Sequence, residues 1–332
     1  MTVVEERVNV AEFREQFERI QTEVGKVMVG QDEVVEEVLI CILAGGHALL
    51  EGVPGLGKTM LVRTLADSLE LSFGRIQFTP DLMPADITGT NILIETENRD
   101  RRFSFQRGPI FANLVLADEI NRATPKTQSA LLEAMQDRTC TVANVVHPME
   151  TPFFVLATQN PVEMEGTYPL PEAQLDRFFF KVLMRFPNEV ELTEILRRTT
   201  STMDTEVQRA ATGASILQMG YLAREVPIAS SVSEYVVRLV MASHPDNARA
   251  TPTVRRYVRY GVSPRGAQAI VLGAKIRALI QGRLNVAYDD IRSVALPALR
   301  HRLILNFEAE SNSISSDDVL RGLLAELPES AS

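Results

Sequence analysis

Residues 48–60 read Ala-Leu-Leu-Glu-Gly-Val-Pro-Gly-Leu-Gly-Lys-Thr-Met, and this stretch decides the fold. Its apolar start has the length of a strand, its middle (52–59) fits G-x-x-x-x-G-K-T, and a helical pattern continues to Glu70. Strand, glycine-rich turn and helix in this order are the context that a phosphate-binding loop requires, which disfavours a chance match. Glycines let backbone N–H groups turn inward around phosphates, and the helix N-terminus adds partial positive charge. We expect Lys58 to reach the β- and γ-phosphates of a nucleotide and Thr59 to offer its hydroxyl to Mg²⁺. The residues expected to bind the nucleotide here are Gly52, Val53, Pro54, Gly55, Leu56, Gly57, Lys58, Thr59 and Met60.

A second apolar strand ends in two acids within the run Leu-Val-Leu-Ala-Asp-Glu (114–119). Beside a phosphate loop, Asp118 is expected to hold Mg²⁺, and Glu119 to polarise the attacking water as general base. The adjacent acid favours hydrolysis by water over transfer to a bound acceptor. The alternative is a solvated strand end, where Asp and Glu are common.

A third apolar strand ends in polar residues within Phe-Val-Leu-Ala-Thr-Gln-Asn (154–160). In open parallel sheets, ligands bind beyond the carboxyl ends of the strands. Asn160 is therefore expected to orient the water or to touch the γ-phosphate. The alternative is a simple strand-to-loop turn before Pro161.

Working outward, short apolar runs alternate with helical patterns, which predicts a parallel sheet covered on both faces. The expected strands are 48–51, 76–79, 113–117, 153–158 and 178–183. Before the fourth strand, the Thr/Val-rich stretch Thr139–Met149 predicts a β-hairpin.

The ends of the chain are expected to be helical. Phe13, Phe17, Ile20 and Val24 recur at helical spacing near the N-terminus, and only helical patterns follow Pro187. We expect an N-terminal helical segment (1–28), a nucleotide-binding α/β core (29–186) and an all-helical lid domain (187–332).

Composition excludes several classes of function. Of the 332 residues, 45% are hydrophobic, and 34 basic against 43 acidic residues give a net charge of −9. An acidic chain is a poor non-specific binder of nucleic acid or membranes. No apolar run reaches the roughly 18–20 residues that cross a bilayer, and the N-terminus lacks a signal pattern, so we expect a cytoplasmic protein. Cys41 and Cys140 are expected to be reduced, and the four histidines match no metal-ligand spacing.

Together these motifs resemble those of AAA+ ATPases, and within that superfamily the chain closely resembles the MoxR family. The resemblance spans roughly residues 45–305 and is most specific in its later stretches. The matching stretches are GGHALLEGVPGLGKT (45–59), RIQFTPDLMPADITG (75–89), GPIFANLVLADEINRA (108–123), ATQNP (157–161), GTYPLPEAQLDRF (166–178) and GVSPRG (261–266).

The resemblance assigns roles to further residues. Asn160 matches the first sensor, and Arg177 matches the arginine finger that works on the nucleotide of a neighbouring subunit. The alternative for Arg177 is a structural pair with Asp176. Arg265 matches the second sensor, in cis or in trans, and is expected to project from the first turn of a helix that Ser263 caps; the alternative is a solvated arginine.

The resemblance also assigns roles to Val29, Gly30 and Arg122. Val29 and Gly30 lie where AAA+ proteins contact the adenine, whereas Gln31 could simply cap the following helix. Arg122 could face a neighbouring subunit or form a structural ion pair.

Two inserts fit this branch of the superfamily, Thr79–Ile94 and the hairpin at Thr139–Met149. Both could face a central pore and touch a client, or merely cover the sheet. The stretch Thr253–Arg265 interleaves arginines with tyrosines, a pattern found in nucleic-acid contacts, but the acidic chain disfavours that reading.

The resemblance implies an ATP- and Mg²⁺-dependent ATPase that forms a hexameric ring and remodels or matures partner protein complexes, including metal or cofactor insertion. A separate protein with a von Willebrand factor A domain is the expected partner, and the client is unidentified. The alternatives are a nucleotide-gated scaffold with little turnover and the ATPase subunit of a metal chelatase. A DNA helicase is disfavoured because the chain lacks a basic face.

Overall fold

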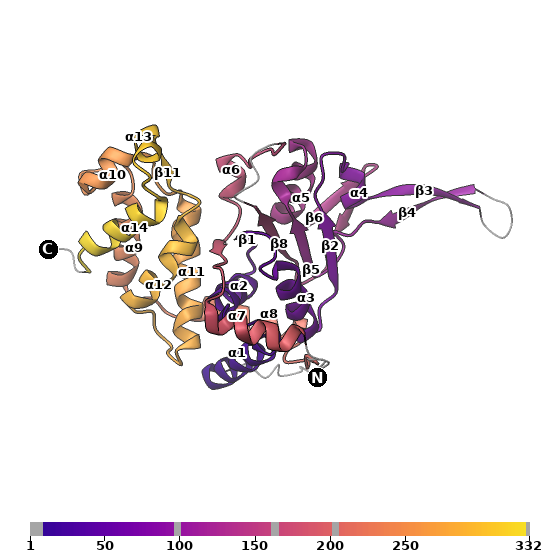
Figure 1. Ribbon diagram of the computed structural model, residues 1–332, viewed down its shortest axis with the longest axis horizontal. Helices are drawn as coiled ribbons and strands as arrows, with labels where there is room; N and C mark the ends of the chain where they lie inside the picture. The colour runs from indigo at the N-terminus through magenta and orange to yellow at the C-terminus, as the bar shows by residue number, and fades with distance from the viewer. Residues whose placement is uncertain (1–8, 96–100, 161–165, 201–205, 330–332) are drawn as a thin grey trace, which may run out of the picture.

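The computed structural model describes residues 9–95, 101–160, 166–200 and 206–329. Figure 1 shows a central α/β core, a helical lobe at the C-terminal side and one hairpin that projects far from the core. Among the described helices, none combines the length and apolar character that crossing a bilayer requires.

The core is built on one five-stranded parallel sheet in the order β2-β5-β8-β1-β9, which confirms the predicted fold class. Register brings the carboxyl ends of the strands to one edge, since Gln77 lies opposite Asp118 and Leu50 opposite Thr158. This alignment is what places the sequence motifs together. The strands are β1 (Ala48–Glu51), β2 (Phe73–Gln77), β5 (Leu114–Asp118), β8 (Phe154–Gln159) and β9 (Phe180–Leu183).

Both faces of the sheet are covered, because alternate residues of its buried strands enter two different apolar clusters. Leu114 and Leu116 face the cluster made with α1, α2 and α3, whereas Val115 and Ala117 face the cluster made with α4 and α5. The helices of the core are α1 (Val10–Gly25), α2 (Asp32–Ala44), α3 (Lys58–Ser68), α4 (Pro84–Thr88), the 3₁₀ turn η1 (Ile120–Arg122), α5 (Pro125–Asp137) and α6 (Glu172–Leu175).

The expected N-terminal helix is present as α1, and its apolar positions Phe13, Phe17, Ile20 and Val24 are buried. Asn9 and Glu12 form a capping box at its start. The predicted hairpin at Thr139–Met149 is also present, as β6 (Thr139–Val142) and β7 (Val145–Pro148).

The insert expected at Thr79–Ile94 is longer than predicted. After α4 it forms a second hairpin, in which β3 (Gly89–Glu95) pairs antiparallel with β4 (Arg101–Arg107). Its outer part carries exposed side chains on both faces, so no alternation of apolar and polar residues marked it.

The C-terminal part is almost entirely helical. Among its described residues, the one departure from the all-helical prediction is a short antiparallel pairing of β10 (Val258–Tyr260) with β11 (Ile304–Leu305), strands too short to leave a periodic signal. Its helices are α7 (Glu189–Thr199), α8 (Gly213–Glu225), α9 (Ser230–Ala242), α10 (Pro252–Tyr257), α11 (Pro264–Ile280), α12 (Tyr288–Leu299), α13 (Phe307–Ser311) and α14 (Ser316–Glu326).

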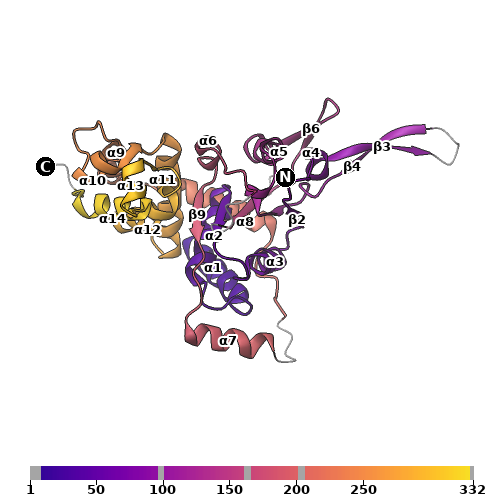
Figure 2. The same cartoon turned by 45° about the horizontal axis from the view of Figure 1, so that its top comes forward.

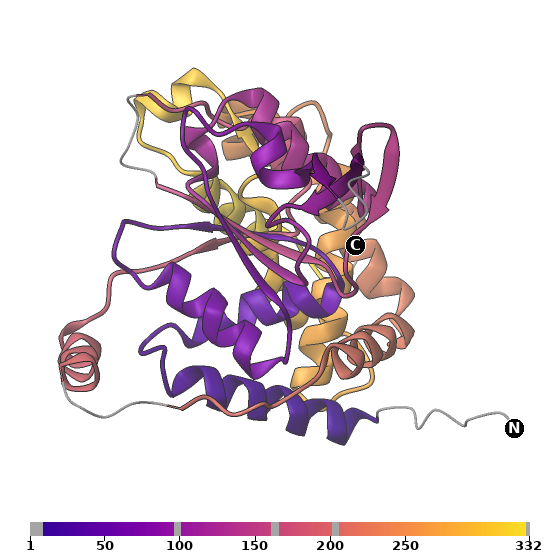
Figure 3. The ribbon, with the colours of Figure 1, turned by 90° about the vertical axis from the view of Figure 1, so that its right-hand side faces the viewer.

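Two of these helices lie outside the lobe formed by α9–α14, although α8 also contacts α11 of that lobe. Helix α8 packs on α2, where Arg224 donates to the carbonyl of Ala44 at 2.9 Å. Helix α7 stands away from the rest of the core in both rotated views (Figures 2 and 3) and buries none of its side chains fully. The division of the chain at residues 28 and 186 therefore stays a prediction.

Candidate functional site

The glycine-rich turn lies between the end of β1 and the start of α3. Gly55 and Gly57 have φ values of +85° and +83°, which residues with a Cβ rarely adopt. Gly57 is the N-cap of α3, so the first free N–H groups of that helix open onto the turn. Local sequence therefore dictates the loop, as the motif predicted.

Lys58 folds back over this loop. Its ammonium donates to the carbonyl of Gly52 and, at 3.2 Å, to the carbonyl of Gln159 at the end of β8. Burial lowers the pKa of Lys58, while Asp118 and Glu119 act in the opposite direction. A half-buried cation that rests on neutral carbonyls is available to an anion.

A cavity of about 510 Å³ collects residues from all three sequence motifs. It lies at the carboxyl edge of the sheet and holds both cationic and acidic side chains. Its lining is Pro54, Gly55, Gly57, Lys58, Thr59, Met60, Asp118, Glu119, Thr158 and Asn160. Of the other predicted loop residues, Gly52 is buried, Val53 is exposed and Leu56 lines a neighbouring cavity.

Asp118 is held in place by two neighbours on adjacent strands. The Thr158 hydroxyl donates to Oδ1 at 2.7 Å, and an Arg75 guanidinium nitrogen donates to Oδ2 at 2.7 Å. Thr158 also accepts from the N–H of Glu119 at 2.9 Å. Because Asp118 and the Thr59 hydroxyl lie in one cavity and are oxygen donors, they fit the preference of Mg²⁺.

Glu119 occupies the left-handed region, with φ +57° and ψ +49°, a conformation that a non-glycine residue holds only where its surroundings fix it. Its carboxylate accepts from Gln77 Nε2 at 2.9 Å and from Arg122 at 3.1 Å. The Arg122 contact is the ion-pair alternative considered for that residue. Sequence reasoning missed Arg75, Gln77 and Thr158, and the signal that could have found them is the register of polar residues at strand ends.

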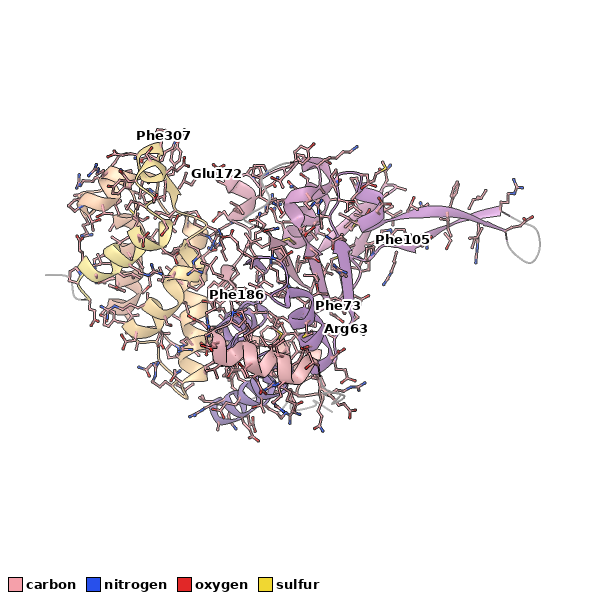
Figure 4. The ribbon with its side chains drawn as sticks, viewed as in Figure 1. Arg63, Phe73, Phe105, Glu172, Phe186 and Phe307 are labelled. Atoms are coloured by element: carbon pink, nitrogen blue, oxygen red, sulfur yellow. The ribbon has the colours of Figure 1, made fainter. Side chains whose placement is uncertain are left out.

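An apolar cavity of about 280 Å³ adjoins the phosphate loop. A concave, apolar site of this kind is suited to hold the base of a nucleotide. Its walls come from the segment before α2, from Leu56 and Met60, and from α7, which sequence reasoning did not assign to the site. Figure 4 shows Phe186 near the start of α7. The apolar lining is Val27, Met28, Val29, Leu56, Met60, Phe186, Pro187, Leu192 and Ile195.

The expected adenine-contacting residues fall at this cavity in part. Val29 lines it, whereas Gly30, at φ +69°, makes the turn that leads to Gln31. Gln31 does not cap α2 with its side chain, and its amide instead donates to the carbonyl of Arg185 at 2.9 Å.

Arg177 and Arg265 lie elsewhere. Both line a cavity of about 730 Å³ between core and lid, bounded by Gly45 and His47 at the amino end of β1. They are therefore at the opposite end of the strand from the phosphate loop. Arg177 donates to the carbonyl of Leu132 on α5 at 2.9 Å.

Arg265 projects from the first turn of α11, as predicted, and its guanidinium is 3.8 Å from the Asp176 carboxylate. Ser263 is the N-cap residue of α11, but its hydroxyl donates to Asp176 at 2.7 Å instead of capping the helix. Asp176 thus faces the lid.

Fold and site together define the class as a P-loop nucleotide-binding protein of the AAA type. A model of the ATPase family associated with various cellular activities (AAA) matches residues 47–180, and a model of the AAA lid domain matches residues 251–323.

Comparison with individual proteins shows to which family within this class the chain belongs. Chaperone MoxR1 of Mycobacterium tuberculosis is 43% identical over 93% of this chain and 81% of its own. Protein MoxR of Methylorubrum extorquens is 30% identical over 89% of this chain and 90% of its own. A crystal structure of a candidate ATPase from Cytophaga hutchinsonii, 40% identical, superposes with a TM-score of 0.89 over 96% of both chains. The chain belongs to the MoxR family of AAA+ ATPases.

Proposed function

We propose that this protein hydrolyses ATP to ADP and phosphate at a site shared between identical chains, and uses the cycle to remodel partner proteins. One observation carries the proposal. Lys58, Thr59, Asp118, Glu119 and Asn160 gather at one end of the sheet, while the two predicted catalytic arginines lie at the other end.

The residues at the carboxyl end of the sheet have separate proposed roles. The loop N–H groups and Lys58 bind the phosphates, and the neighbouring apolar cavity, with Val29 in its wall and Gly30 next in the chain, takes the base. Thr59 and Asp118 would hold Mg²⁺, which supplies charge neutralisation on the phosphates when bound. Glu119 accepts the proton of the attacking water, and Asn160 orients that water.

A second chain must complete this site. Arg177 of a neighbour would neutralise charge on the transferring phosphoryl group, and Arg265, which lines the same cavity, would join it in trans. Repeating one such heterologous contact around an axis closes a ring, and we propose a hexamer.

The remodelling role rests on kinship, since one relative is named Chaperone MoxR1. We propose a cytoplasmic chaperone for the maturation of protein complexes, including metal or cofactor insertion, that works with a separate von Willebrand factor A domain protein. Nucleic acid is not a proposed partner.

A nucleotide-gated scaffold is the second candidate. Gln77 and Arg122 both hold the Glu119 carboxylate, and this favours a site in which turnover waits for a rearrangement. Phosphate release measured with and without a partner protein separates a slow scaffold from an active ATPase.

Glu119→Gln tests the proposed hydrolysis directly. We expect ATP binding to persist while turnover falls about 10²- to 10⁴-fold, because the general base is lost but the phosphate loop is intact. Binding is measured by calorimetry and turnover by phosphate release. Glu150→Gln, an exposed acid paired with Arg107, is the matched control. Turnover of Glu119→Gln within a few-fold of the parent protein would show that another group is the base.

A further inference from the structure

The segment that carries Arg177 is short and is held from both the core and the lid. It runs from Asp176 to Phe179, between α6 and β9. On the core side, the N–H of Phe179 donates to the carbonyl of His47 at 2.7 Å, the Arg177 guanidinium donates to the carbonyl of Leu132 on α5 at 2.9 Å, and Phe178 is buried in the core. On the lid side, the residues that follow α12 take its carbonyl oxygens.

Arg302 makes most of these lid contacts. Its guanidinium donates to the carbonyls of Asp176 (3.0 Å), Phe178 (2.6 Å) and Phe179 (3.0 Å), on both sides of Arg177. Its Nε also donates to the Asp176 carboxylate at 2.8 Å. His301 adds a hydrogen bond from Nε2 to the carbonyl of Phe178 at 3.0 Å.

Arg302 is only 6% exposed. A buried guanidinium is costly unless its donors are satisfied, and a well-packed apolar side chain would hold two lobes together at least as well. What the guanidinium adds is a planar fork that fixes several acceptors in one orientation. The contact of Arg302 with the segment 176–179 therefore fixes the orientation of that segment, in addition to holding the lid against the core.

Asp176 extends this contact to the start of α11. Its carboxylate accepts from Arg302 and from the Ser263 hydroxyl at 2.7 Å, and it lies 3.8 Å from the Arg265 guanidinium. One carboxylate thus lies next to Arg177 in the chain and next to Arg265 in space.

We propose that Arg302 and Asp176 form a joint that couples the finger segment 176–179, which the core also holds, to the lid, so that the lid of one chain positions Arg177 for the nucleotide of the next. This inference rests on the proposed shared site. Arg302 and Asp176 are positioning residues, whereas Arg177 is the catalytic residue. Through this joint, the angle between lid and core in one chain determines the rate of ATP hydrolysis in the neighbouring chain.

Arg302→Lys tests the joint, because lysine keeps the charge and loses the planar fork. Arg300→Lys is the matched control. Arg300 is also a nearly buried lid arginine, bound to Asp317 and to the carbonyl of Lys181 on β9, but it does not hold the finger segment.

We expect Arg302→Lys to lower kcat about 10- to 100-fold with little change in KM for ATP, since the phosphate loop of each chain is intact. Arg300→Lys should keep kcat within about twofold of the parent. Ser263→Ala, which removes one contact to Asp176, should give a smaller loss of the same kind.

Mixed assemblies add a readout that a general loss of stability does not produce. A Lys58→Ala chain supplies an intact finger, so mixing it with Arg302→Lys should restore turnover. Mixing Arg302→Lys with Arg177→Ala should restore none, because both chains lack a working finger. Rescue in neither mixture, or equal kcat for Arg302→Lys and Arg300→Lys, would overturn the role of the joint.

Amide hydrogen exchange separates failure of the joint from failure of the shared site. The amides of residues 176–179 should exchange faster in Arg302→Lys than in Arg300→Lys, whatever the turnover. If Arg177→Ala turns over like the parent protein, the shared site is wrong, and exchange still decides the joint. Equal exchange in the two lysine variants would overturn the joint.

Discussion

The two ends of the parallel sheet are built differently. At the carboxyl end, each acidic side chain has partners within the same chain, since Thr158 and Arg75 hold Asp118 while Gln77 holds Glu119. At the amino end, the cavity between core and lid gathers cations that outnumber the acids. Its charged lining is Arg177, Arg224, Arg265, Lys275 and Arg302 against Asp176.

Under the proposed shared site, this difference means that one chain carries two incomplete halves of one site. The carboxyl end has an anion-binding loop and a candidate base, and the amino end has five cations around a single acid, Asp176. Complementary charge on two faces of the same molecule favours head-to-tail association. The predictions below test whether the carboxyl end of one chain and the amino end of a neighbouring chain form one catalytic site.

The largest effect is expected from Arg177→Ala. Loss of an arginine that stabilises the transferring phosphoryl group costs about 10³- to 10⁵-fold in kcat. We expect a loss toward this range with ATP binding retained, and partial recovery when the variant is mixed with Lys58→Ala. Arg209→Ala, an exposed arginine paired with Glu70, is the control. If no mixing ratio restores phosphate release, the two ends do not combine between chains.

A smaller effect is expected in the apolar cavity beside the phosphate loop. Ile195→Ala on α7 removes part of its wall, and burial of about two to three methylenes contributes about 2 kcal/mol. The dissociation constant for ADP should rise about 10- to 30-fold, with kcat at saturating ATP nearly unchanged. Calorimetric titration measures this constant.

Val190→Ala is the control for the cavity, because Val190 is 80% exposed on the same helix. If both α7 variants bind ADP equally well, the base does not sit against α7, and the carboxyl end lacks the wall proposed for it.

Sequence reasoning reached the carboxyl end because its residues are close together in the chain. Residues 52–59 are one motif, and Asp118 and Asn160 each terminate a recognisable apolar strand. Parallel register then brings the three motifs to one edge without further information.

The amino end could not be derived in this way. Arg302 and Asp176 are 126 positions apart, and although Asp176 lies in the quoted stretch 166–178, no periodicity or spacing links it to Arg302. Their contact depends on the angle at which the lid packs on the core, which local patterns do not encode. The same reason explains why the sequence predicts only that residues 187–332 form a helical lid and does not indicate that α7 is a wall of the base cavity.

The smallest expected effect concerns the contact between lid and core and appears as a dependence on pH. Burial raises the pKa of Glu37 on α2 to about 8, with Glu33 and Asp317 acting in the same direction and Arg300 opposing them. The folded protein therefore binds this proton more tightly than the unfolded chain does. The stability that the protonated group provides is complete below about pH 4.5 and is lost as the pH rises toward 8.

Glu37→Gln should accordingly match the parent protein at pH 5 and melt about 2–4 °C higher at pH 9, because glutamine stays neutral. Thermal unfolding followed by circular dichroism at both pH values measures the difference. Glu234→Gln, at an exposed site on α9, controls for the general loss of a negative charge. A Glu37→Gln variant that melts at the parent temperature at pH 9 would mean that water reaches the carboxylate and that the lid opens away from α2. The joint at Arg302 would then have to hold the finger segment without support from this side of the lid.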